Sequence, residues 1–418
     1  MLQIDHIYEF FYNVLFNKNC EIHCLPSGVP KLGTVDTADI TVFTPAEMVT
    51  KKMLCYDQEP ILPNMINKYV EIFQRLEQYD LEELKVLDNT PESVHLDNLA
   101  NPNRVYKTPG IVAVSEHSEQ VDLLVKKYNL KLLYYFFHGF AALDWYRGYY
   151  ALNCNKSIVK QYNYDFITFN RLITEDRSYR IYFVSQLAKH DLIDKGLVSF
   201  GVADNVQHWR DELERNTMSK LSQHARQEIW NVLPDLPDRL YIDGDNIPGA
   251  ASTTIARSNS FTSQNKESSK DAFWHIVTET VFYYDKLHLT EKIFKPIVSK
   301  QPFMLLAAPG NLEYLRRYGF KTFDGIIDES YDLIQDDDAR IDAVVKQMKW
   351  YCNLSQEEKS RVIERLAPIV EYNFQHFYGK FKEIITDELL ENTKTLFKEI
   401  EYDDSQIDYA TLRKLLTS

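Results

Sequence analysis

Short apolar runs of strand length alternate with helical stretches along most of this chain, and this alternation limits the possible folds more than any other feature. Four runs in the first half have the length and the β-branched or aromatic composition of strands. They are ITVFT (40–44), KMLCYD (52–57), IVAVS (111–115) and LKLLYYFF (130–137). Between them, residues 63–84 repeat apolar side chains every three and four positions, which predicts a helix packed on a core. The alternation predicts an α/β domain with a parallel sheet.

The second half repeats this pattern after a polar bridge, ALNCNKSIVKQYN (151–163). A helix is expected over 179–190, and the chain is helical and amphipathic from 356 onward. The expected strands are DFITFN (165–170), LVSFG (197–201), DAFWHIVTET (271–280) and QPFMLLAA (301–308). We therefore expect two Rossmann-like α/β domains, over 1–155 and 160–355, and C-terminal helices over 356–418 that pack across both. The length of 418 residues suits two domains of ordinary size.

Charge and cysteine content argue against several classes of protein. The formal net charge of −14 is unfavourable for a surface that binds nucleic acid throughout, because phosphate binding depends on basic residues that release counterions. Basic residues do gather between Lys156 and Arg180, so a local basic cleft stays open. The five cysteines lack the paired spacing of a zinc site and are expected to be reduced thiols. The N-terminal apolar run is too short and polar to span a bilayer, so we expect a cytoplasmic protein. We also expect a monomer.

Residues with the clearest chemical pattern lie at Thr290, Glu291 and Lys292, between two expected strands. Thr290 suits the position before a helix, where a side-chain oxygen accepts a hydrogen bond from the first turn. The positive end of such a helix, together with Lys292 and Lys295, favours a bound diphosphate. Glu291 is placed to accept hydrogen bonds from ribose hydroxyls. The same letters occur at ordinary helix starts, so the motif alone leaves both interpretations open.

The segment around this motif resembles a known group of enzymes. Between Phe273 and Asp332 it contains ETVFYY, LTEKIFKPI, QPF, PGNLEYLRRYGFKTF and DESYD, and it is similar to glycosyltransferases of phages and bacteria. TEKIF is also similar to the donor-binding motif of the α-1,3-fucosyltransferase family, in which the Glu and Lys contact the nucleotide sugar. The resemblance implies the two-domain GT-B architecture, with the donor held by the second domain. It implies that Glu291 and Lys292 contact the donor, and we expect Glu279 and Thr290 in the same donor site.

A second stretch, residues 166–201, resembles the same group through an Asn-Arg pair followed by further arginines. Asn170 and Arg171 end a strand. Arg177 and Arg180 open the next helix, and guanidinium groups bind diphosphates through paired hydrogen bonds. Arginines at strand ends also pair with surface carboxylates, which is the other interpretation. The implied co-substrate is a nucleoside-diphosphate sugar, with UDP favoured as the nucleotide.

The first domain is expected to hold the acceptor and the general base, which removes a proton from the attacking hydroxyl. Asp57 and Glu59 directly follow a strand in YDQEP (56–60), at the sheet edge where open α/β folds bind ligands. Either carboxylate is a candidate base. A simple turn closed by Pro60 explains the same letters.

A further stretch that resembles the group is FFHGFAALDWYRGYY (136–150). His138 and Asp144 compete there for the role of base, although a hydrogen-bonded core histidine explains His138 equally well. Trp145 and Arg147 are expected to contact the acceptor.

Metal-binding patterns are weak in this sequence. IDGDN (242–246) contains the letters of an Asp-x-Asp motif, but it lies in a turn rich in Gly and Pro. The two glutamates seven residues apart that mark retaining enzymes are missing, since Glu279 and Glu291 lie further apart. We therefore expect catalysis without a metal or other cofactor, with arginine and lysine supplying positive charge.

The acceptor remains open at the level of sequence. The chain looks similar to enzymes of T4-like phages that add a sugar such as arabinose to 5-hydroxymethylcytosine, which implies double-stranded DNA as acceptor and the host cytoplasm as location. The acidic balance favours a surface glycan or other saccharide instead. A non-catalytic sugar-nucleotide-binding protein is the alternative from another class. Residues 249–270, rich in Ser, Thr and Asn, are expected to form either a surface insertion or an acceptor-binding loop.

Overall fold

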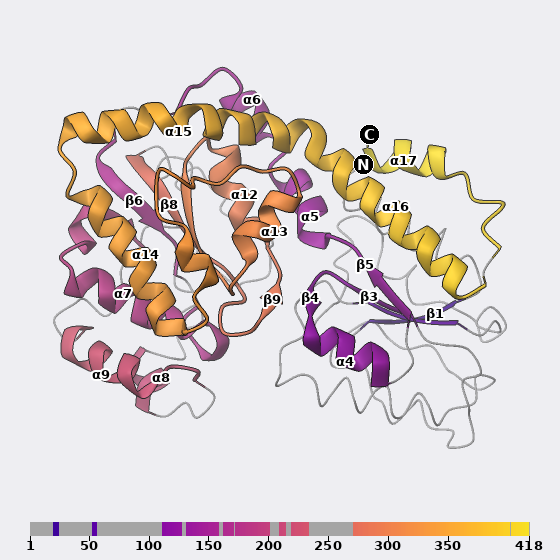
Figure 1. Ribbon diagram of the computed structural model, residues 1–418, viewed down its shortest axis with the longest axis horizontal. Helices are drawn as coiled ribbons and strands as arrows, with labels where there is room; N and C mark the ends of the chain where they lie inside the picture. Colours follow the sequence, from indigo (N-terminus) through magenta and orange to yellow (C-terminus); the bar gives the residue numbers. More distant parts are fainter. Residues whose placement is uncertain are drawn as a thin grey trace, which may run out of the picture. The chain divides into compact units, whose positions relative to one another are not determined.

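The computed structural model describes residues 20–24, 52–56, 111–127, 131–158, 162–170, 172–200, 209–214, 219–233, 271–401 and 403–417. They form a mixed α/β fold, with a parallel four-stranded sheet flanked by helices and a long C-terminal helix (Figure 1). The chain divides into two compact units. The first joins residues 1–144 to 382–418, and the second comprises residues 145–381.

The first unit contains a parallel sheet with strand order β1-β2-β3-β5. Its strands are β1 (Cys20–Cys24), β2 (Lys52–Tyr56), β3 (Ile111–Val114) and β5 (Lys131–Tyr134). The last three confirm predicted strands. The strand predicted to reach residue 137 ends earlier, because the Phe137 N–H donates to Ser115 Oγ at 3.0 Å and helix α5 (Phe137–Trp145) begins there. The strand expected at 40–44 and the helix expected at 63–84 lie outside the described residues.

Helices of the first unit include α4 (Glu119–Lys127), α16 (Lys382–Glu399) and α17 (Tyr409–Thr417). Helix α16 packs on β5, where Asn392 Nδ2 donates to the Tyr134 carbonyl at 3.0 Å. A surface ion pair of 3.5 Å between Lys131 and Glu399 joins the same two elements. The C-terminal part of the chain therefore completes the unit that its N-terminal part begins.

The second unit is built on a parallel sheet with order β10-β8-β6-β7. Its strands are β6 (Tyr164–Thr168), β7 (Gly196–Val198), β8 (Ala272–Thr278) and β10 (Phe303–Leu306). All seven residues of β8 are buried, as expected for a central strand with both faces covered. The four strands predicted in this half are confirmed, each shorter than its apolar run.

Helices cover this second sheet (Figure 1). Helix α12 packs on β8 and β10, and α14 packs on β10 and on α7. The principal helices are α7 (Tyr179–Lys189), α12 (Glu291–Val298), α13 (Asn311–Arg317), α14 (Asp337–Cys352) and α15 (Gln356–His376). Shorter helices are α6 (Tyr149–Asn153), α8 (Trp209–Glu214) and α9 (Gln223–Val232). Among the helices of the described ranges, none is long and apolar enough to cross a bilayer.

The C-terminal helical run starts at Ser355, which caps α15 through a reciprocal pair of hydrogen bonds with Glu358. Helix α15 continues into a π-helical turn, η9 (Phe377–Phe381), and then into α16. The chain passes between the two compact units at two points. One division falls between Asp144 and Trp145, and the other falls between Phe381 and Lys382.

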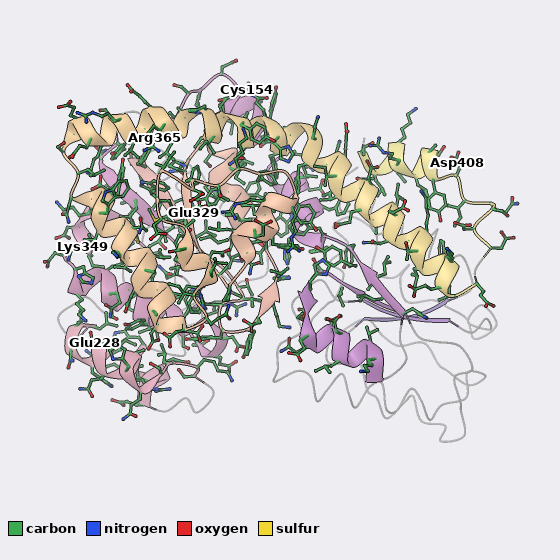
Figure 2. All side chains as sticks on the ribbon, in the orientation of Figure 1. Cys154, Glu228, Glu329, Lys349, Arg365 and Asp408 are labelled. Carbon is green, nitrogen blue, oxygen red and sulfur yellow. The ribbon has the colours of Figure 1, made fainter. Side chains whose placement is uncertain are left out.

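Turn residues after α13 are organised by the carboxylate of Glu329, which is labelled in Figure 2 and is 7% exposed. Its oxygens accept hydrogen bonds from Arg316 Nη2 at 2.7 Å, Thr322 Oγ1 at 2.7 Å and the Phe323 N–H at 2.6 Å. A charged acceptor with several donors offsets its cost of burial. The segment GFKTFDGIIDES is therefore a fixed turn beside the sheet.

Candidate functional site

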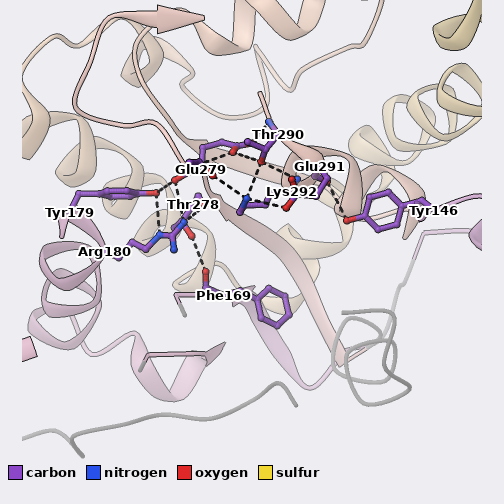
Figure 3. A network of polar contacts seen from close by, with 10 residues as sticks. Tyr146, Phe169, Tyr179, Arg180, Thr278, Glu279, Thr290, Glu291 and Lys292 are labelled. Carbon is purple, nitrogen blue, oxygen red and sulfur yellow. Dashed lines mark hydrogen bonds and ion pairs between the residues drawn. The ribbon is translucent and has the colours of Figure 1, made fainter. Parts of the chain in front are cut away.

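Polar side chains converge where β8 ends and α12 begins (Figure 3). The carboxyl ends of parallel strands are the usual ligand-binding edge of an open α/β sheet. Helix α12 starts at Glu291 because Thr290 has an extended backbone and its Oγ1 accepts a hydrogen bond from the Lys292 N–H at 3.3 Å. The predicted N-cap is therefore confirmed. A helix start carries partial positive charge, which favours an anion at this edge.

The carboxylate of Glu279 forms the buried base of this cluster and has no exposed surface. Its Oε1 accepts from the Thr290 N–H at 3.1 Å, and its Oε2 accepts from Thr290 Oγ1 at 2.6 Å and from the Thr280 N–H at 3.1 Å. These bonds join the end of β8 to the residue that caps α12. In this geometry Glu279 positions the helix start, and a direct contact with a donor stays a prediction.

Lys292 supplies the cation of the cluster. Its Nζ donates to Thr280 Oγ1 and Thr290 Oγ1, both at 3.2 Å, and to Glu291 Oε1 at 3.0 Å. The Lys292 side chain is 37% exposed, whereas that of Glu291 is 13% exposed. The ammonium group is thus held in one place by three protein oxygens while part of it remains accessible. An anion at the helix start would meet a preorganised positive charge.

Arg180 lies in the first turn of α7, as predicted. Its buried guanidinium donates from Nη1 to the Leu172 carbonyl at 2.9 Å, and from Nη2 to the Thr278 and Glu279 carbonyls at 2.8 and 3.2 Å. The neighbouring Tyr179 hydroxyl also donates to the Glu279 carbonyl, at 2.6 Å. Arg180 therefore holds the carboxyl end of β8 in this geometry, and its contact with a diphosphate remains a prediction.

Lys295 lies one turn further along α12 and is 8% exposed. Its Nζ is 3.8 Å from the centroid of the Phe169 ring, which follows β6. His275 on β8 packs on the same ring, with centroids 5.5 Å apart. Burial, and next the positive charge of Lys295, lower the pKa of His275 to about 3. A second cation is thus held at the edge of the sheet where β6 and β8 end.

The other predicted donor residues follow β6. Asn170 is fully buried, and its Nδ2 donates to the Ser199 carbonyl at 3.0 Å and to Thr168 Oγ1 at 3.3 Å. Asn170 therefore ties the ends of β6 and β7 together. Arg177 lies in a single 3-10 turn, η4 (Glu175–Arg177), and is half-buried. Arg171 lies outside the described residues.

Two residues that the sequence interpretation missed hold the loop between β8 and α12. Asn311 is fully buried, its Nδ2 donates to the Lys286 carbonyl at 2.9 Å, and its Oδ1 accepts from the His288 N–H at 3.0 Å. Arg340 on α14 donates from Nη2 to the Phe282 carbonyl at 2.8 Å. The asparagine after Pro-Gly in PGN was a readable signal of a turn with a polar anchor. Arg340 carries no such local signal, because it reads as one charge on an amphipathic helix.

Candidates for the base lie in or near the first unit. Asp57 and Glu59 are outside the described residues. His138 and Asp144 lie on α5 and are only 4% and 6% exposed, so the structure places both within the packed interior. Of the predicted acceptor contacts, Trp145 is half-buried and Arg147 is exposed.

His117, which the sequence interpretation did not select, begins the two-residue strand β4 (His117–Ser118), which follows β3 at the carboxyl edge of the first sheet. Its ring is exposed and stacks on the Tyr134 ring, with centroids 3.8 Å apart. The adjacent Ser118 Oγ donates to the buried Glu116 carboxylate at 2.5 Å. A histidine directly after a strand run, in VSEHS, was the available signal. Its exposure makes His117 an additional candidate for the base.

Metal ligands do not gather in the described part of the chain, where no three His, Cys, Asp or Glu side chains are close enough to hold an ion together. The IDGDN segment lies outside that part. The described cluster at the start of α12 offers a helix start, a held lysine and a buried carboxylate.

Asp332, in the DESYD run, gives a prediction that tests the packing next to the site. Burial raises the pKa of this carboxyl to about 7, although the Leu312 N–H donates to its Oδ2 at 3.1 Å. The folded protein then keeps the Asp332 proton up to a higher pH than the unfolded chain does. The protonated carboxyl therefore contributes to stability in full below about pH 4, and this contribution is lost as the pH rises through about 7. Asp332→Asn removes the ionisation. We expect its Tm, relative to wild type, to rise between pH 4 and pH 8 in calorimetry. A difference that stays constant with pH would contradict this assignment.

Comparisons of the chain with protein-family models, with curated proteins and with solved structures find no match. The inference of function therefore depends on the residues and on their geometry.

Proposed function

We propose that this protein is a glycosyltransferase that transfers a sugar from a nucleoside diphosphate to a hydroxyl acceptor, without a metal ion. The observation that carries the proposal is the held, partly exposed Lys292 at the start of α12, on a framework built by Glu279 and Thr290. A nucleoside diphosphate is the leaving group of such a reaction, and it gains negative charge as the bond to the sugar breaks. A fixed cation and a helix start stabilise that charge where it develops.

The order of residues around the cluster supports the same proposal. The TEKIF run that resembles a donor-binding motif of glycosyltransferases coincides with the cap and first turn of α12. Lys295 adds a second positive charge on the same helix. In this proposal the diphosphate of the donor, with UDP favoured, binds beside Lys292, and Glu291 accepts hydrogen bonds from ribose hydroxyls. The GT-B architecture, with the acceptor and the base in the first unit, is part of the proposal.

The acceptor hydroxyl belongs either to 5-hydroxymethylcytosine in DNA or to a saccharide. The resemblance to phage enzymes favours the modified base, which an enzyme reaches by turning it out of the duplex. The net charge of −14 favours a saccharide. A protein that binds the nucleotide sugar without turnover is the alternative outside the class of enzymes.

One experiment tests the activity and the acceptor together. Purified protein is incubated with UDP- and GDP-sugars, with or without DNA that contains 5-hydroxymethylcytosine, and free nucleotide and nucleoside mass are measured. Release of UDP or GDP together with a mass gain on the nucleoside supports a DNA-modifying transferase. Release that depends on an added saccharide supports the other acceptor. Tight binding of the donor without release of UDP or GDP, under all conditions, would indicate a binding protein and not an enzyme.

Variants of the candidate bases form a prediction of their own. Loss of the base lowers the rate of transfer by about 10²–10⁴-fold while donor affinity is kept. We expect that result for one of Asp57→Asn, Glu59→Gln or His117→Gln, measured by kcat and by the Kd of the donor. His138→Gln and Asp144→Asn are expected to lower the Tm rather than the rate, because both side chains are buried.

The assignment of the base fails if all three rates stay at the wild-type value. It also fails if His138→Gln or Asp144→Asn lowers kcat strongly at an unchanged Tm. In that case a buried side chain must reach the acceptor, and the structure of the first unit must change on binding.

A further inference from the structure

Both ends of α12 are held by the segment that opens the second unit. Tyr146 is 1% exposed, and its hydroxyl donates to the Glu291 carbonyl at 3.3 Å (Figure 3). At the other end, Asn153 Nδ2 donates to the Val298 carbonyl at 2.7 Å. Lys300, just beyond the helix, donates from Nζ to the Lys156 carbonyl at 2.7 Å. The first turn of α12, which carries Lys292, therefore takes its position partly from the segment 146–156.

The π-helical turn η9 contacts the same helix. The Phe377 and Phe381 rings lie 5.4 and 5.1 Å from the ring of Phe294 on α12, measured between centroids. The Tyr378 hydroxyl donates to the Tyr146 carbonyl at 2.8 Å. The turn is thus joined to α12 directly, by ring packing, and indirectly, through Tyr146. Turns of this kind interrupt the regular helical hydrogen bonds and often occur at functional positions.

These two tyrosines stand beside the two points where the chain passes between the compact units. The chain enters the second unit at Trp145, one residue before Tyr146, and leaves it after Phe381, three residues beyond Tyr378. Burial, and next the charge of Glu291, raise the pKa of the Tyr146 hydroxyl well above its usual value, so this group keeps its proton and remains a donor at neutral pH. Two hydrogen bonds, from Tyr378 to the Tyr146 carbonyl and from Tyr146 to the Glu291 carbonyl, therefore link both of these points to α12.

We propose that Tyr146 and Tyr378 are positioning residues that couple occupancy of the α12 start to the two segments through which the chain passes between its units. A ligand that binds to Glu291 and Lys292 fixes the first turn of α12. The hydrogen bonds of Tyr146 and Tyr378 transmit this order to η9. The coupling rests on the proposed function in one respect, since it takes a nucleoside diphosphate as the ligand.

Hydrogen exchange of the whole chain, with and without UDP or GDP, tests the coupling without any need for turnover. In wild type we expect the nucleotide to slow exchange in peptides that cover 290–295 and also in peptides that cover 377–381. Tyr146→Phe removes only the hydroxyl and keeps the ring. This variant should bind the nucleotide about 3- to 10-fold more weakly, the effect of one hydrogen bond. At saturation it should keep the slowing at 290–295 and lose the part of the slowing at 377–381 that the hydroxyl transmits, while the ring packing on Phe294 stays.

Tyr372→Phe is the matched control, because the Tyr372 hydroxyl, on the long helix α15, donates instead to the Gly319 carbonyl at 3.0 Å. It should behave like wild type in both sets of peptides. If Tyr146→Phe does not fold, Tyr378→Phe removes the second bond and must give the same loss at 377–381.

Two results overturn the inference in distinguishable ways. The coupling is wrong, and the donor site stands, if the nucleotide slows exchange at 290–295 in wild type without any change at 377–381. The same holds if both tyrosine variants keep the full slowing at 377–381. No binding of either nucleotide by wild type removes the proposed donor site and the coupling with it.

Discussion

Lys292→Ala is expected to lower the rate of sugar transfer by about 10²–10³-fold, the usual effect of removing one preorganised group that stabilises developing negative charge. The fold should remain, because the Lys292 side chain is 37% exposed and Thr290 Oγ1 keeps its hydrogen bond to Glu279 Oε2 in the variant. Initial rates of nucleotide release, together with a thermal unfolding curve for each variant, measure the two effects separately.

Two further variants sharpen this result. Lys292→Met keeps the length of the side chain without its charge, so it should lose as much rate as Lys292→Ala if the charge is what matters. Lys349→Ala removes an exposed lysine of α14 in the same unit (Figure 2) and should keep the wild-type rate. Wild-type turnover in Lys292→Ala would show that the anion binds elsewhere.

Glu279→Ala is expected to cause the largest loss of stability among single changes at the site. The substitution leaves three donors without their acceptor in a place with no exposed surface, namely the Thr290 N–H, the Thr290 hydroxyl and the Thr280 N–H. Each unsatisfied buried donor costs about 1–3 kcal/mol, so we expect a total on the order of 3–5 kcal/mol after local relaxation. A Tm lower by roughly 10 °C corresponds to that loss in a unit of this size.

Conservative and surface variants provide the controls. Glu279→Gln keeps the volume and one acceptor oxygen but turns an amide N–H₂ towards one of the donors, so its Tm should fall between those of wild type and Glu279→Ala. Glu313→Ala removes an exposed partner of Arg316, and such surface pairs contribute about 1 kcal/mol or less. Equal melting temperatures for Glu279→Ala and Glu313→Ala would mean that the buried network does not hold the loop.

Local patterns in the sequence were sufficient for the elements that carry the site. The strand β8 follows from an apolar run of the right length, and the start of α12 at Glu291 follows from the capping chemistry of Thr290. Strand ends were predicted too late, as with the run that continues to residue 137. The reason is that aromatic residues continue the apolar pattern into α5, where a hydrogen bond to Ser115 turns the chain.

The roles of individual polar side chains could not be read in the same way. Arg180 was expected to reach a diphosphate, yet its guanidinium is bonded to carbonyls at the end of β8. Arg340 looked like an ordinary surface residue, although it anchors the loop before α12. A side chain with several donors binds whichever acceptors the fold brings near, and the sequence around it does not specify them.

The sequence by itself determined the alternation of strands and helices and the residue at which α12 begins, because each depends on neighbours within one or two turns of chain. Only the tertiary structure assigned the partners of the polar groups. Arg180 meets the Thr278 carbonyl 98 residues away, and Tyr378 meets the Tyr146 carbonyl 232 residues away. Such pairs form when packing closes long stretches of chain, and it is this packing that gives Lys292 a fixed position at the edge of the sheet.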